Sequence, residues 1–134
     1  MLFAMSIEKV IGMSKEVILS NGEKVIVKKL PLGDYAKLMF VLKNLPSNVL
    51  KEFQNMDTTN NENVISSFFG IFGEAWGQII EILAIGTGID KERLEKDEAI
   101  GIDGAVELLL AVYEVNNLGS VIKTVKNLLT GAKN

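Results

Sequence analysis

VISSFFGIFGEAWGQIIEILAI, residues Val64 to Ile85, is the longest apolar stretch of the chain, and its interpretation decides the fold. Its 22 residues would be long enough to span a bilayer as one helix. Glu74 and Glu81 argue against a membrane span, because each carboxylate at the centre of a bilayer costs roughly 2.5–3.5 kcal/mol. At about 100° per residue, these two acids share one narrow polar stripe with Ser67 and Gln78. The stretch therefore predicts the central helix of a bundle, outside any membrane.

Three glycines, Gly70, Gly73 and Gly77, lie inside this predicted helix. Each weakens a helix by roughly 1 kcal/mol relative to alanine, so their presence needs a reason. The spacing from Gly73 to Gly77 allows a second backbone to approach closely. We therefore expect a tight helix crossing here, either within one subunit or between two subunits.

Upstream of this stretch, residues 16–30 predict a β-hairpin. Two short apolar, β-branched runs flank Ser20-Asn21-Gly22-Glu23, and Asn-Gly favours a type I′ turn, in which both central residues have positive φ. An isolated hairpin is only marginally stable. We expect its apolar face to pack on helices.

The remaining segments have helical patterns. Tyr35, Leu38, Met39 and Leu42 recur at helical spacing after a possible Asp34 cap, and Asn44-Leu45-Pro46 ends that helix. Further predicted helices cover residues 47–56 and 105–115, the latter capped by Asp103, and a polar loop covers residues 57–63. Gly86-Thr87-Gly88 should end the central helix, and Asn116-Asn117 should break the chain before a last amphipathic helix.

Together these patterns predict a mainly α fold of about five to six helices with a small N-terminal hairpin. Residues 16–134 form a single predicted domain, with the hairpin at 16–30 and the helical bundle at 33–130. Residues 1–15 are predicted to be a separate N-terminal extension.

The composition narrows the possible functions. The chain contains no histidine and no cysteine, so common catalytic dyads and zinc sites lack their usual ligands. The net charge is −3 and the pI is about 5.0, which disfavours nucleic-acid binding. The acids of residues 90–98 alternate with lysine and arginine, which indicates a solvated charged turn rather than a metal site. We predict no catalytic residue, no cofactor and no metal.

The apolar side chains that remain are candidates for contact with a partner. Four aromatic residues of the central stretch share helical spacing, and so do apolar residues of the last helix. These faces are either ordinary core or a groove for a partner helix. The candidate partner-binding residues are Phe68, Phe69, Phe72, Trp76, Val121, Ile122, Val125, Leu128 and Leu129.

The order of these segments resembles a tail assembly chaperone of long-tailed phages or prophages of Gram-positive bacteria. The resemblance rests on the hairpin that leads into KKLPLGDYAKL (residues 28–38) and on the apolar helix before Gly86. It continues through IGIDGAVELL (residues 100–109), EVNNL (residues 114–118) and the amphipathic C-terminal helix.

This resemblance implies a helical, self-associating, non-enzymatic protein that acts in the host bacterial cytoplasm and is absent from the mature virion. The implied partner is the tape measure protein, with the tail tube protein as a further candidate; nucleic acid and membrane are not expected partners. The alternative is a generic helical adaptor or regulator that self-associates through its C-terminal amphipathic helix.

Overall fold

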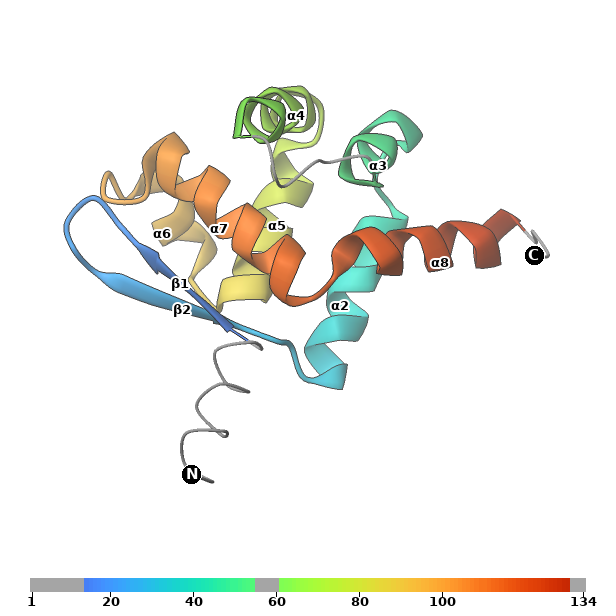
Figure 1. Cartoon of the computed structure of the whole chain (residues 1–134), viewed down its shortest axis with the longest axis horizontal. Coiled ribbons are helices and arrows are strands. Elements are labelled where there is room, and N and C mark those ends of the chain that lie inside the picture. The colour runs from blue at the N-terminus through green and yellow to red at the C-terminus, as the bar shows by residue number, and fades with distance from the viewer. Residues whose placement is uncertain (1–13, 55–60, 131–134) are drawn as a thin grey trace.

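The computed structural model describes residues 14–54 and 61–130 as an N-terminal β-hairpin and seven helices (Figure 1). The mainly helical fold with a small hairpin is confirmed. Most of the predicted N-terminal extension lies outside the described residues. The strands are β1 (Ser14–Ile18) and β2 (Lys24–Lys28), and the helices are α2 (Leu32–Lys43), α3 (Ser47–Gln54), α4 (Asn61–Glu74), α5 (Trp76–Thr87), α6 (Lys91–Lys96), α7 (Gly101–Val115) and α8 (Leu118–Thr130).

The hairpin is antiparallel, and its register places Val17 opposite Val25. These two residues and Val27 are buried, while their neighbours on β2 are exposed, as the period of two in a strand requires. The buried face packs on α5 and α7, so the hairpin obtains from helices the support that it cannot provide for itself.

The turn of the hairpin differs from the predicted type I′ turn. Gly22 has a positive φ of 89°, but Asn21 is not among the described residues with positive φ. The Gly22 N–H donates to the Leu19 carbonyl at 2.9 Å, and the Leu19 N–H donates to the Glu23 carbonyl at 2.8 Å. These bonds define a three-residue loop that closes on a left-handed glycine, which is the next most common hairpin connection.

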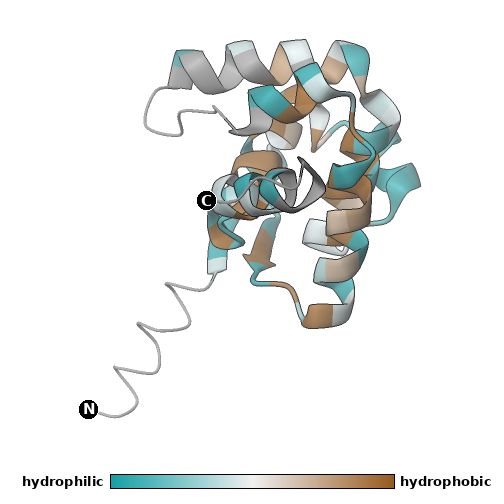
Figure 2. Ribbon diagram, turned by 90° about the vertical axis from the view of Figure 1, so that its right-hand side faces the viewer, coloured by the Kyte–Doolittle hydropathy of each residue, from teal (hydrophilic) through white to brown (hydrophobic). Residues whose placement is uncertain are grey.

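Helix α5 is the centre of the molecule and contacts α2, α4, α6, α7 and β2. Its Ile79, Ile82 and Leu83 are almost completely buried, together with Leu38 of α2 and Leu108 of α7. Each such side chain stabilises the fold by about 1.5–3 kcal/mol. The surrounding helices carry hydrophobic and hydrophilic residues side by side, as amphipathic elements around a central helix should (Figure 2).

The predicted single helix over residues 64–85 is wrong, because the chain breaks at Ala75 into α4 and α5. Ala75 has φ −138° and ψ 44°, and the chain bends by 113° between the two helical segments. A straight 22-residue helix would be about 33 Å long, whereas α2 and α7 are about 18 and 22 Å long and could not cover it. Among the described helices, none taken singly is both long enough and apolar enough to cross a membrane.

Two of the predicted helix caps are also wrong. Helix α2 begins after Pro31 and α7 begins after Ile100, so Asp34 and Asp103 lie within the first turns rather than at the caps. Their charge still favours the positive end of the helix dipole. Of the predicted loop 57–63, residues 61–63 belong to α4, and the rest lies outside the described residues. Gly88 ends α5 in the left-handed conformation, as predicted.

The break between α7 and α8 contains a buried polar residue, Asn116, which is 2% exposed. Its Oδ1 accepts the Leu30 N–H at 3.0 Å, and its Nδ2 donates to the Val112 carbonyl at 3.1 Å. The Tyr35 hydroxyl donates to the Asn116 backbone carbonyl at 2.9 Å. The predicted break is confirmed, and hydrogen bonds that satisfy the buried Asn116 join it to the end of the hairpin, to α2 and to α7.

The expected close helix crossing within the subunit is absent at Gly70, Gly73 and Gly77, since a Cβ at any of them would meet nothing within 4 Å. The close approach is instead at Gly86, where a Cβ would lie 2.6 Å from both Cγ atoms of Val112. This contact sets the distance between α5 and α7. The crossing between subunits stays a prediction.

We expect Gly86→Ala to lower the free energy of unfolding by about 1–3 kcal/mol, because the added methyl group overpacks the contact with the stiff Val112 side chain. Urea denaturation followed by circular dichroism measures this change.

Two comparisons make this test specific. Gly70→Ala places a methyl group in open space within α4 and should raise stability by up to about 1 kcal/mol. The double variant Gly86→Ala/Val112→Ala should lose less free energy of unfolding than the sum of the two single variants. The reason is that Val112→Ala removes the γ-methyl groups with which the methyl group added at position 86 collides. Strict additivity would show that the contact does not limit the approach of the helices.

Candidate partner-binding groove

Three of the predicted site residues form a continuous aromatic row across the break between α4 and α5. The Phe68 and Phe72 rings stack with centroids 5.4 Å apart, and Phe72 meets Trp76 edge-on at 4.6 Å. Phe68 is buried, Phe72 is half-buried, and Trp76 is 41% exposed. The row therefore leads from the core to the surface across the break at Ala75.

This aromatic row forms one side of a groove of about 300 Å³. The rest of its lining comes from α5, from α6 and the segment after it, and from the start of α7. The lining is mainly carbon, and residues 95–98 contribute charged side chains. Its lining residues are Phe68, Phe72, Trp76, Ile79, Ile80, Leu83, Leu94, Glu95, Lys96, Asp97, Glu98, Gly101, Ile102 and Ala105.

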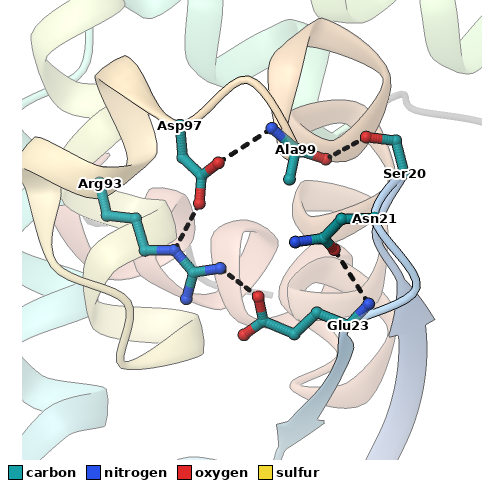
Figure 3. Close-up of polar contacts among 6 residues, drawn as sticks. All are labelled: Ser20, Asn21, Glu23, Arg93, Asp97 and Ala99. Atoms are coloured by element: carbon teal, nitrogen blue, oxygen red, sulfur yellow. Dashed lines mark hydrogen bonds and ion pairs between the residues drawn. The ribbon is translucent and has the colours of Figure 1, made fainter.

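The α6 side of the groove is attached to the hairpin turn through Arg93 (Figure 3). The Arg93 Nε donates to Asp97 Oδ2 at 2.7 Å, and its Nη2 forms an ion pair with Glu23. Asp97 Oδ1 accepts the Ala99 N–H at 2.9 Å. The Ala99 carbonyl in turn accepts the Ser20 hydroxyl at 3.0 Å, so residues far apart in sequence form one polar network.

The electrostatics of this network follow from its contacts. The hydrogen bond from Arg93, followed by the Ala99 N–H, lowers the pKa of the Asp97 carboxyl below its ordinary value of 3.8. The Glu23 and Asp97 carboxylates raise the pKa of the Arg93 guanidinium. The charged segment 90–98, predicted to be a solvated turn, therefore also has a structural role.

The other predicted site residues do not join this groove. Phe69 is 55% exposed but is not among the residues that line it. Val121 is half-buried on α8, whose backbone lies against α3 and α7. The side chains of Ile122, Val125, Leu128 and Leu129 lie outside what the structure describes.

Sequence reasoning missed Ile102, which is 44% exposed at the edge of the groove. Ile102 lies between the charged segment 90–98 and the predicted helix 105–115, and no local pattern there shows that it is exposed. The predicted polar stripe of the central helix is also divided. Glu74 accepts hydrogen bonds from Asn48 Nδ2 at 2.7 and 2.8 Å, while Glu81 forms an ion pair with Lys91.

The arrangement is suited to binding apolar side chains. Over residues 14–54 and 61–130, no group of three or more acidic side chains is placed to hold a metal ion. No protein-family model, no curated protein and no solved structure matches this chain.

We expect the stability contributed by Asp97 to be complete above about pH 3.8 and to be lost as the pH falls below that value. The folded carboxyl binds its proton more weakly than the unfolded one, so acid favours unfolding. Urea denaturation at several pH values should show wild type more stable than Asp97→Asn at pH 7, with the difference narrowing below about 3.8.

Glu98→Gln is the control for this pH series, because it removes a nearby exposed carboxylate that has no ion pair in the described structure. It should change stability little at pH 7. A difference between wild type and Asp97→Asn that stays constant into strong acid would contradict the assignment.

Proposed function

We propose that this protein is a non-enzymatic tail assembly chaperone of a bacteriophage or prophage that binds the tape measure protein in the host cytoplasm. The observation that carries the proposal is the row of Phe68, Phe72 and Trp76, which opens an apolar groove to solvent. The resemblance in the order of sequence segments supports the same function. We also propose that the protein self-associates and is absent from the mature virion.

The groove has the properties that a chaperone for a helical protein needs. An amphipathic helix presents apolar side chains at i, i+3, i+4 and i+7, which dock into an apolar groove on a partner. A groove of about 300 Å³ accommodates a few such side chains. Covering them stabilises the complex by about 25 cal/mol per Å² of apolar surface removed from water, and it also prevents their aggregation with other copies.

The alternative function, an adaptor that self-associates through the C-terminal helix, stays a prediction. The backbone of α8 lies against α3 and α7 of the same chain, and α8 does not line the groove. The aromatic groove therefore supports the binding of a different protein more strongly than α8 supports self-association as an adaptor.

Co-expression with an otherwise insoluble fragment of the tape measure protein tests the proposal. We expect the wild type to bring the fragment into the soluble fraction. Trp76→Ser combined with Ile102→Ser should abolish this effect, because a central tryptophan contact is typically worth about 2 kcal/mol or more, which is roughly thirtyfold in affinity. Trp76 is the only tryptophan, so its fluorescence also reports occupation of the groove in the wild type.

Leu32→Ser is the matched control, because Leu32 is 85% exposed and does not line the groove. This variant should still solubilise the fragment. If wild type leaves the fragment insoluble, the chaperone function is wrong. If the groove variant solubilises as well as Leu32→Ser does, the groove is not the binding surface.

A further inference from the structure

A second depression of about 280 Å³ lies between the hairpin turn and the start of α7. It shares Glu98, Gly101 and Ile102 with the aromatic groove, so the two depressions adjoin. Ile18, which is 57% exposed, lies on its hairpin side. We call this combined surface the trough. A partner that fills the aromatic groove can continue along it to the hairpin.

The trough carries a net negative charge, because its lining holds five acids and one lysine, Lys96, which pairs with Glu92 outside it. Glu95 and Glu98 line the aromatic groove, and Asp103 and Glu107 line the second depression. All four are exposed, and within residues 14–54 and 61–130 none of them has an ion pair. Asp97, which also lines the aromatic groove, differs from these four acids because it forms an ion pair with Arg93.

We propose that the segment bound in the trough is an amphipathic helix whose apolar stripe is flanked by lysine or arginine. This inference rests on the proposed function, in which the segment belongs to the tape measure protein. Its apolar side chains contact the aromatic row and Ile102, and its basic side chains reach Glu98 and Asp103. Long basic side chains suit this surface, because their carbon stems can cover Ile18 while their charges meet the acids.

A second copy of this chain is a less suitable occupant. The last helix carries lysine and no acid from residue 118 onward, but it already packs on α3 and α7. Phosphate-bearing partners are disfavoured because the trough is negative.

Two synthetic peptides of about 18 residues, five helical turns long, test the inference. Both carry the same leucine stripe and no tryptophan; one is flanked by lysine and the other by glutamate. Binding is followed by the fluorescence of Trp76. In about 20 mM salt we expect the lysine peptide to bind at least about tenfold more tightly, and this preference should shrink in about 0.5 M salt, where exposed charges are screened.

A matched pair of variants locates the charge effect. Glu98→Lys should weaken binding of the lysine peptide about tenfold at low salt. Glu52→Lys makes the same change in net charge at an exposed position on α3 outside the trough, and should change binding less than about twofold.

Three results would overturn the inference: equal binding of the two peptides by wild type, equal loss in Glu98→Lys and Glu52→Lys, or tighter binding of a peptide of residues 118–130 than of the lysine peptide. The last result would identify a second copy as the occupant. In each case the co-expression experiment decides the chaperone function separately, because solubilisation of the tape measure fragment does not depend on which charge preference the trough has.

Discussion

The contact between Gly86 and Val112 limits how closely α5 and α7 approach, and the rest of the fold is arranged around that pair. Val112 places both of its γ-methyl groups where a side chain at position 86 would begin. With α7 held this close, α5 is covered by α7 on one side and by α2, α6 and β2 on others. The hairpin then packs over both helices, and Asn116 joins its end to the α7–α8 corner.

The break at Ala75 connects this core to the candidate function. An uninterrupted apolar helix would extend beyond the elements available to cover it. Bending the chain buries Phe68 and Ile79 in the core, while Trp76 stays at the surface. The aromatic row crosses this bend, so it connects the core at Phe68 with the groove at Trp76.

The hairpin contributes to the groove although it lies in the first part of the chain. Arg93 forms contacts with Glu23 in the hairpin and with Asp97 beside the groove. Charge-assisted hydrogen bonds of this kind have defined geometry, so they hold the α6 side of the groove in a fixed position relative to the hairpin. Fold and candidate binding surface thus share one polar network.

Local patterns were sufficient to predict the hairpin, the helix end before Pro46, the Gly88 cap and the break near Asn116. Each of these features depends on the conformational preferences of a few adjacent residues, and these preferences follow from the residue types alone. The aromatic row was also visible, because Phe68, Phe72 and Trp76 recur at helical spacing.

Tertiary structure alone decided the bend at Ala75, the choice of Gly86 rather than Gly73 or Gly77 for close packing, and the place of Ile102 in the groove. The helical spacing of apolar residues does not show which neighbouring element packs against each face of a helix. The contact from Arg93 to Glu23 joins residues 70 positions apart, so it could not be predicted from local sequence. Such outcomes depend on which surfaces meet when the core closes, and no local preference contains that information.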